Sequence, residues 1–349
     1  MDWGYINARM RGMKSRLLDR RTLDALILQP DPDSLIGELE KTAYRDDLIE
    51  AKGRYTGIPA IEYALRTNMV RTFRKILAFA KKEEADRYIR IFLHRWDVQN
   101  IKTILRGKNI HVTNDEIKSC IVPAGELDEA TLTELVRQKD PRAVIDLLAT
   151  WRISYAQPLT AAFPSFARDG GIGILETALD RYYYADALAA VAGPGPNNAL
   201  IRQVLATEID VVNIRTVLRM VRDRVEPAEA AAFLVDGGRD LDKKALFRLL
   251  ALPSIGDVVA ALAATRYRFL AAVPEEAIRA KKISAIEREL ERFLIREGAG
   301  SFRGDPLSVA SLVGYFWAKY NEVTNIRIIA RCKTADFPVE RVREELVYV

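Results

Sequence analysis

The sequence has little of the chemistry on which most enzymes depend. Its 349 residues include two cysteines, Cys120 and Cys332, and two histidines, His94 and His111. There is no G-x-x-x-x-G-K-S/T loop, no G-x-G-x-x-G after a strand, no H-E-x-x-H and no C-x-x-C. A nucleotide site, a zinc site and a histidine-based catalytic triad therefore have no recognisable source. We expect no catalytic residue, no cofactor and no metal, and two free thiols in a reducing compartment.

Long apolar stretches are also missing. No run on the order of 18 apolar residues is present, and the N-terminus leads into arginines without the apolar core of a signal peptide. We therefore expect a chain that stays in the cytoplasm, alone or docked to a partner. Its 53 basic and 48 acidic residues give a net charge of +5. This mild excess admits nucleic acid, an acidic protein or a membrane surface as partner without choosing among them.

The hydrophobic pattern predicts an all-α protein, because no stretch shows sustained alternation of period two. Three long helices are expected, one that begins after Glu84 and ends at Gly107 as a glycine cap, and two over 199–222 and 307–332. Three further helices carry a glutamate each, over 60–79, 174–191 and 277–296. Residues 298–306 are expected to form a loop, and the ring of Trp151 is expected in the core.

One ten-residue phrase occurs three times. It reads DVQNIKTILR at 97–106, DVVNIRTVLR at 210–219 and EVTNIRIIAR at 322–331, so its asparagines are 113 and 112 residues apart. The glutamates Glu62, Glu176 and Glu287 recur at nearly the same spacing within I/L-E-x-x-L motifs. A unit repeated at this period indicates three similar helical domains of about 110 residues, 1–112, 113–225 and 226–349.

Each phrase places two cations one helical turn apart. The pairs are Lys102 with Arg106, Arg215 with Arg219, and Arg327 with Arg331. Like charges at this spacing repel by a few tenths of a kcal/mol, so something should compensate them. Glu62, Glu176 and Glu287 are possible partners within the same domain. Alternatively, three domains around a pseudo-threefold axis present a ring of six cations to a partner.

The asparagine of each phrase, Asn100, Asn213 or Asn325, has a structural interpretation. A buried side-chain amide is usually hydrogen-bonded, and we expect each one to bond a neighbouring helix end rather than a ligand. The first helix, expected over 5–18, has an apolar stripe surrounded by four cations. Those cations are interpreted as a solvated face in preference to a phosphate-binding surface.

Several motifs together resemble one known family. They are YINARMR at 5–11, DVQNI at 97–101 followed by LRGK at 105–108, WAKYNEVTNIR at 317–327 and VREELV at 342–347. They look like the C subunit of the archaeal and bacterial A/V-type rotary ATPases, which is similar to the d subunit of the eukaryotic vacuolar enzyme. The middle phrase departs most from the others, with Met220 and Val221 where the first has Gly107 and Lys108.

The resemblance implies a funnel of three similar helical domains on the cytoplasmic face of the cell membrane. Such a subunit is peripheral and catalyses nothing itself. Its implied partners are the D and F subunits of the central shaft and the membrane proteolipid ring, within a larger complex that contains the catalytic A and B subunits. It would transmit torque as part of the rotor during ATP synthesis or ion pumping, with no nucleic acid and no small-molecule substrate bound.

A helical-repeat scaffold or nucleic-acid-binding protein is the competing interpretation. A basic balance and helical repeats would fit it. The period of about 110 residues, however, is far longer than the roughly 33–47 residues of the common helical repeats. Cations and acids are also interleaved along the chain without a basic block. We therefore prefer the rotor subunit.

Overall fold

The computed structural model describes residues 3–80, 84–335 and 337–349, and every regular element in these ranges is a helix. Contacts divide the chain into two compact units. Unit 1 comprises Met1–Leu93, Val122–Glu126 and Ile295–Val349, and unit 2 comprises His94–Ile121 and Leu127–Leu294. Two helices, α6 (Glu84–Asn109) and α17 (Ile283–Gly300), contain residues of both units. The all-α prediction is confirmed for the described residues.

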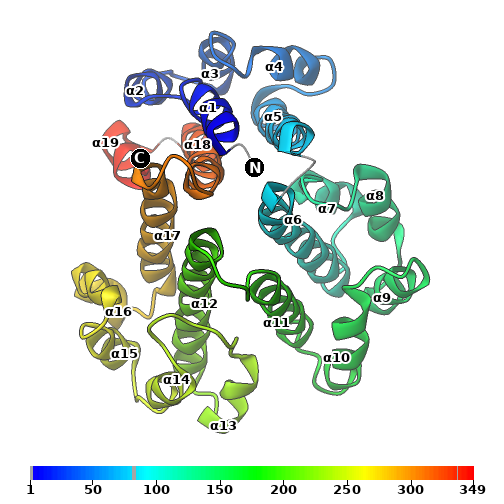
Figure 1. The fold of residues 1–349 in the computed structure, drawn as a ribbon, viewed down its shortest axis with the longest axis vertical. Coiled ribbons are helices and arrows are strands. Elements are labelled where there is room, and N and C mark those ends of the chain that lie inside the picture. The colour runs from blue at the N-terminus through cyan, green and yellow to red at the C-terminus, as the bar shows by residue number, and fades with distance from the viewer. Residues whose placement is uncertain (1–2, 81–83, 336) are drawn as a thin grey trace. The chain divides into compact units, whose positions relative to one another are not determined.

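Unit 1 is built around α18 (Ala310–Thr334), which is buried along most of its length. In Figure 1 it runs beside α1, and it also contacts α2, α3, α5, α19 and η3. The aromatic rings of Phe73 and Phe92 lie 4.8 and 5.2 Å from that of Phe316 on α18. The remaining helices of the unit are α1 (Trp3–Lys14), α2 (Arg20–Ile27), α3 (Pro32–Leu39), α4 (Arg45–Lys52), α5 (Gly57–Ala80), η3 (Ser301–Arg303) and α19 (Val339–Glu345).

Unit 2 is organised around α12 (Pro196–Asp223), which contacts α11, α13, α14 and α15. Its green ribbon lies beside α11 and α14 in Figure 1. The other helices are α7 (Asn114–Cys120), α8 (Glu129–Arg137), α9 (Pro141–Thr150), α10 (Ala156–Asp169), α11 (Gly173–Ala190), α13 (Pro227–Ala230), η1 (Ala231–Phe233), α14 (Lys243–Leu250), α15 (Ile255–Leu262), η2 (Arg266–Ala272) and α16 (Glu275–Arg279).

Three short helices begin in the same way. An aspartate precedes each one, and its carboxylate accepts the backbone N–H of the third residue along: Asp19 caps α2, Asp128 caps α8 and Asp242 caps α14. A leucine stands immediately before each aspartate. Because an aspartate cap stabilises a helix by roughly 1 kcal/mol, the position at which each helix begins is set by its own sequence.

Two glycines lie inside helices although sequence reasoning assigned one to a helix end and the other to a loop. Gly107 does not cap α6, which continues to Asn109, and a Cβ at this position would lie 2.6 Å from the side chain of Ile117. The predicted loop over 298–306 begins within α17, where a Cβ on Gly298 would lie 2.1 Å from the ring of Trp317. Both glycines are required by close packing, which a local sequence pattern does not reveal.

Two further predictions are wrong. The helix expected over 277–296 is broken, because α16 ends at Arg279, Lys281 takes a left-handed φ of 53°, and α17 begins at Ile283. Trp151 does not lie in the core but follows the end of α9 with 40% of its surface exposed. The division into three domains of about 110 residues remains a proposal.

Candidate functional site

The acid that opens each repeated phrase is buried and holds the start of a capped helix. Asp97 accepts the backbone N–H of Leu127 at 3.0 Å, and Asp210 accepts that of Leu241 at 3.3 Å. Glu322 accepts the backbone N–H of Leu18 at 2.5 Å. These are the three leucines that precede the capping aspartates. Each phrase therefore holds the residue that precedes one capped helix. The first phrase does so for α8, the second for α14 and the third for α2.

Asp210 accepts two more hydrogen bonds. The backbone N–H of Asp240 lies 2.8 Å from its carboxylate and the hydroxyl of Tyr267 lies 2.9 Å from it. Burial raises the pKa of Asp210, and these donors oppose that rise. Gly238 lets the chain approach this closely, since a Cβ there would lie 2.2 Å from the carboxylate oxygen. The carboxylate thus joins α12 to the loop before α14 and to η2.

Glu322 is the centre of a second buried network, in unit 1. The hydroxyl of Tyr44 donates to its carboxylate at 2.7 Å, and the ammonium of Lys319 donates at 2.7 Å. The same ammonium lies 2.9 Å from the Tyr44 hydroxyl, and both charged side chains are at most 5% exposed. Burial, reinforced by Glu322, raises the pKa of Tyr44 well above its ordinary value. The network joins α18 to the N-terminal segment of the chain.

The asparagines of the second and third phrases each bind the main chain through both the nitrogen and the oxygen of the side-chain amide. Asn213 donates to the carbonyl of Val235 and accepts its N–H, both at 2.8 Å. Asn325 donates to the carbonyl of Val347 at 2.8 Å and accepts its N–H at 3.1 Å. Asn100 is also buried. Val235 lies just beyond η1 and Val347 just beyond α19, so each amide fixes the chain that leaves a helix.

The repeated cations all reach acidic residues or a backbone carbonyl. In unit 2, Lys102 pairs with Asp180 at 2.8 Å, Arg106 with Glu176 at 2.6 Å and Arg219 with Glu287 at 2.5 Å, while Arg215 donates to the Glu287 carbonyl at 3.4 Å. In unit 1, Arg327 and Arg331 both bind Glu62, at 2.8 and 3.2 Å. The repulsion within each cation pair is therefore offset inside the chain.

The pairing differs from the expected one in a specific respect. Each glutamate was expected to bind cations of its own predicted domain, but each one binds a cation of another domain. Glu62 of the first domain binds Arg327 of the third. Glu176 of the second binds Arg106 of the first, and Glu287 of the third binds Arg219 of the second. In unit 1 the reason is that α5, which carries Glu62, packs against α18. The acidic partner Asp180, whose pKa is raised by burial against the effect of Lys102, was not predicted.

We expect a double-mutant cycle between Glu62 and Arg327 to give a coupling free energy of about 1 kcal/mol, because the pair is hydrogen-bonded and about one-quarter to one-third exposed. The measurement is urea unfolding of wild type, E62Q, R327M and the double variant. The exposed pair Arg341 and Glu344, 3.5 Å apart, serves as control and should give a coupling near zero. Equal couplings for the two pairs would show that the pair of Glu62 and Arg327 stabilises the fold no more than an exposed pair does.

A buried acid outside the phrases lies in unit 2. Glu208 on α12 is 2% exposed, and Arg95 lies 3.3 Å from one of its carboxylate oxygens. Burial raises the pKa of Glu208, and the charge of Arg95 opposes the rise. The buried rings of Tyr183 and Tyr184 have raised pKa values, first from burial and then from the charge of Glu208. Sequence reasoning missed this group because no local pattern distinguishes it.

Glu208→Gln should change how stability depends on pH. The unfolded chain loses the Glu208 proton near the ordinary pKa of 4.5, whereas the folded chain keeps it to higher pH. Between the two pKa values the folded state binds more protons, so this group lowers wild-type stability as pH rises. Urea unfolding between acidic and neutral pH should therefore show E208Q gaining on wild type. Parallel pH profiles for the two proteins would contradict the assignment.

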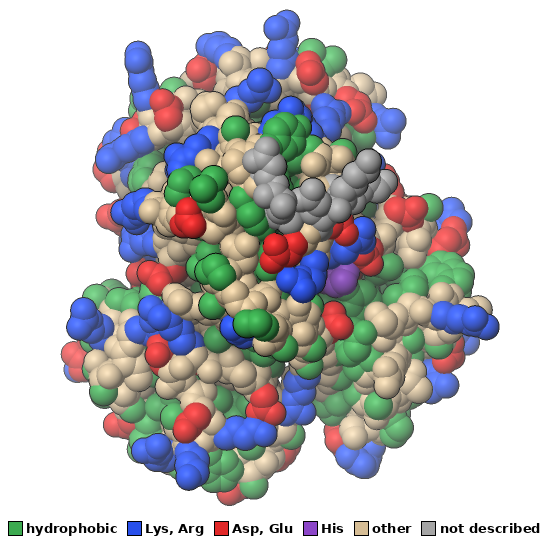
Figure 2. Space-filling model, viewed as in Figure 1, with side chains coloured by type: hydrophobic (Ala, Val, Ile, Leu, Met, Phe, Trp, Pro, Cys, Tyr) green, Lys and Arg blue, Asp and Glu red, His purple; other side chains and the backbone are tan. Residues whose placement is uncertain are grey.

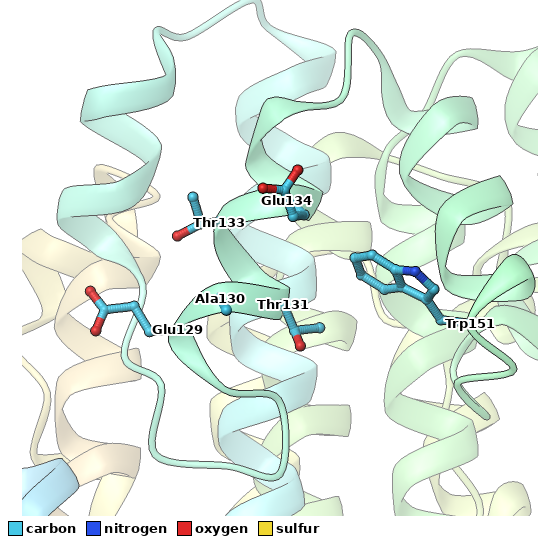
Figure 3. A pocket seen from close by; sticks show the side chains of 6 residues that line it. All are labelled: Glu129, Ala130, Thr131, Thr133, Glu134 and Trp151. Carbon is cyan, nitrogen blue, oxygen red and sulfur yellow. The ribbon is translucent and has the colours of Figure 1, made fainter.

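A shallow pocket of about 530 Å³ lies on unit 2, between α8 and the residue that follows α9. In Figure 3 the indole of Trp151 points toward α8, which carries Thr131 and Glu134, and the carboxylate of Glu134 is directed away from the ring. Glu134 is already paired with Arg137 at 2.5 Å. The pocket contains no residue of the repeated phrases and no arrangement suited to acid–base or nucleophilic chemistry.

Within the described ranges no group of three or more histidine, cysteine, aspartate and glutamate residues is arranged to hold a metal ion. Over the same ranges, no helix combines the length and apolar character needed to cross a bilayer. The candidate site is therefore the set of contacts made by the three phrases. The members that sequence reasoning did not single out include Asp180, Leu18, Tyr44, Lys319 and Tyr267. A repeated signal was present for two of them, because Tyr44 and Tyr267 each follow a similarly spaced leucine and threonine.

The family model and the individual relatives that match this chain all belong to one subunit family. The model of the ATP synthase (C/AC39) subunit family matches residues 6–345. The chain is 31% identical to the C subunit of the A-type ATP synthase of Methanococcoides burtonii, over 99% of this chain and 94% of that protein. It is 28% identical to the protein of the same name from Methanosarcina acetivorans, over 100% and 93%. For the one from Haloferax volcanii the identity is 28% over 98% and 97%.

Proposed function

The chain belongs to the ATP synthase (C/AC39) subunit family, and we propose that it is the rotor component that couples the central shaft to the membrane ring. It is a subunit of an A/V-type ATP synthase, and its relatives are not the catalytic subunits of that complex. The observation that carries the proposal is the match over nearly the whole chain to proteins of one name. In this role it transmits torque and catalyses nothing.

The order of the contacts supports a closed arrangement of three domains. The first phrase binds residues of the second predicted domain, through Asp97 with Leu127 and Arg106 with Glu176. By the same two kinds of contact the second phrase binds the third domain and the third phrase binds the first. A cyclic order of this kind is what three similar units around an axis require. We propose a funnel with pseudo-threefold symmetry.

In this proposal the repeated cations hold the domains to one another. Arg106, Arg219 and Arg327 each form an ion pair with a glutamate. These pairs favour contacts between neighbouring domains over a ring of six cations that binds a partner. The wide end of the funnel would receive the D and F subunits of the shaft, and the narrow end would rest on the proteolipid ring. The protein would lie peripherally on the cytoplasmic face of the membrane, in a complex with the catalytic A and B subunits.

Depletion of the chain from its own cells tests the coupling role. Membranes from depleted cells should retain the proteolipid ring, and the catalytic subunits recovered from them should still hydrolyse ATP. Ion movement driven by that hydrolysis should be lost, and re-expression of the wild-type chain should restore it. Ion pumping that continues at the wild-type rate in depleted membranes would show that the chain is not the coupling element.

The competing scaffold or nucleic-acid-binding function has less support. Figure 2 shows lysine and arginine side chains interleaved with aspartate and glutamate over the visible face, without a large area of one sign. A protein that binds nucleic acid through phosphate contacts would lose affinity steeply as salt rises. We expect the full chain to show no such salt-dependent binding to duplex DNA or RNA.

A further inference from the structure

The first helix carries cations that the proposed function does not use. Arg9, Arg11 and Lys14 lie on α1 and Arg16 follows it, all exposed, and no acid occurs from Trp3 to Leu18. The buried side of the helix is formed by Trp3, Ile6 and Met10. Arg9 is held over the rings of Tyr5 and Phe79, at 5.8 and 5.0 Å. The opposite side of α1 is therefore a cationic surface turned to solvent.

The short helix η3 brings another cation, Arg303, to this surface. The ammonium of Lys14 lies 4.1 Å from the ring centre of Phe302, and Arg303 is the next residue. Burial, followed by the charges of Arg11 and Arg303, lowers the pKa of Lys14. We name Arg11, Lys14 and Arg303 the cationic cluster. The charges of Arg11 and Arg303 both act on the ammonium of Lys14.

Among the described residues, no ion pair offsets this repulsion. Arg11 donates to the amide of Asn7 at 3.2 Å, and neither Lys14 nor Arg303 forms a salt bridge. Two neighbouring acids are already engaged by the backbone: Asp19 caps α2, and Asp305 accepts the N–H of Leu307 at 2.8 Å. The repeated phrases show the contrast, because each of their cation pairs has a carboxylate within the chain. Within the described residues, therefore, the cluster lacks the carboxylate partner that each repeated cation pair has.

Two features close to the cluster in sequence favour a membrane surface as its partner. Leu307, four residues after Arg303, is 64% exposed. A Cβ added to Gly12, between Arg11 and Lys14 in sequence, would meet nothing within 4 Å, so this part of α1 is open to approach. Arginine and lysine beside an exposed apolar side chain are typical of surfaces that contact lipid headgroups and the acyl boundary beneath them.

We propose that the cationic cluster, together with Leu307, binds phosphate groups of anionic lipids on the membrane surface. The inference rests on the proposed function to the extent that a membrane-bound ATP synthase brings the chain to such a surface. It adds a direct lipid contact, besides the protein contacts through which the chain is coupled to the rest of the complex. Electrostatic attraction would supply most of the binding, so the contact weakens as salt screens it.

Co-sedimentation of the full chain with vesicles tests the proposal. At about 20 mM salt, the chain should sediment with vesicles of about one-third phosphatidylglycerol in phosphatidylcholine, and not with pure phosphatidylcholine. Each lost cation should lower the partition coefficient about fivefold, so R11Q/K14Q/R303Q should bind on the order of a hundredfold more weakly. Leu307→Gln, compared with wild type, should weaken binding most clearly at high salt. There the electrostatic attraction is screened and the apolar contribution of Leu307 remains.

The matched control is K244Q/R248Q/R268Q, which removes three exposed cations outside the cluster. This control should bind like wild type. Equal loss in both triple variants, or no preference of wild type for anionic vesicles, would overturn the proposal. Binding to a duplex DNA or to an acidic peptide that depends on the cluster, without vesicle binding, would overturn it in favour of that partner. Recovery of each variant with the ATP synthase complex reports separately on the proposed function.

Discussion

Lys319→Met is expected to lower the free energy of unfolding by about 3–5 kcal/mol, because it leaves the buried charge of Glu322 without its ion partner. The carboxylate would keep the N–H of Leu18 and the hydroxyl of Tyr44 but lose a donor at 2.7 Å. Methionine has a similar length, so little packing volume is lost. Urea unfolding of the full chain, followed by circular dichroism, measures the change.

A second variant separates the buried charge from simple loss of packing. K319M/E322Q removes the charge that K319M strands, so it should regain a substantial part of the lost stability. Arg341→Met, which removes one partner of an exposed pair, serves as the control and should cost less than about 1 kcal/mol. If the double variant is no more stable than K319M, the lysine acts through its stem and not through its charge.

Asp210→Ala is expected to lower the free energy of unfolding by about 3–5 kcal/mol, because three donors lose their acceptor at once. These donors are the backbone N–H groups of Asp240 and Leu241 and the hydroxyl of Tyr267. No solvent reaches the carboxylate, since Asp210 is fully buried. Asp210→Asn keeps one acceptor oxygen and should cost clearly less. Chemical denaturation gives each difference directly.

Two single-contact variants calibrate this effect. Tyr267→Phe removes one of the three donors and should cost about 1 kcal/mol. Asp242→Ala removes the cap of α14 without touching the buried carboxylate, and should also cost about 1 kcal/mol. An Asp210→Ala cost no greater than either of these would show that the carboxylate is not the junction between α12, η2 and the loop before α14.

Much of the architecture could be predicted from periodicity alone. The long helices α6, α12 and α18 were expected within a few residues of their observed bounds, because their apolar stripes extend for six or more turns. Compensation of the repeated cations by Glu62, Glu176 and Glu287 was one of two interpretations that elementary electrostatics offered, since adjacent like charges need an opposite charge nearby, and the expected pairing within each domain was wrong. Apolar periodicity and charge spacing therefore indicated the long helices and the charged residues that form ion pairs.

The partners of those residues could not be derived locally. Glu62 and Arg327 are 265 residues apart in sequence, and which helix packs on which depends on the whole fold. The same applies to Gly107 and Gly298, which are small because Ile117 and Trp317 pack against them and not because a helix ends there. The buried pair of Lys319 and Glu322 was hidden for a different reason: an i, i+3 charge pair is usually an exposed one.

The most direct test of the rotor proposal is recovery of the tagged chain from gently solubilised membranes of its own cells. Every protein retained with the tag is then identified by mass spectrometry. The proposal predicts the D and F subunits of the shaft, the catalytic A and B subunits and the proteolipid together in one complex. Recovery of nucleic acid, or of unrelated soluble proteins without any of these components, would contradict it.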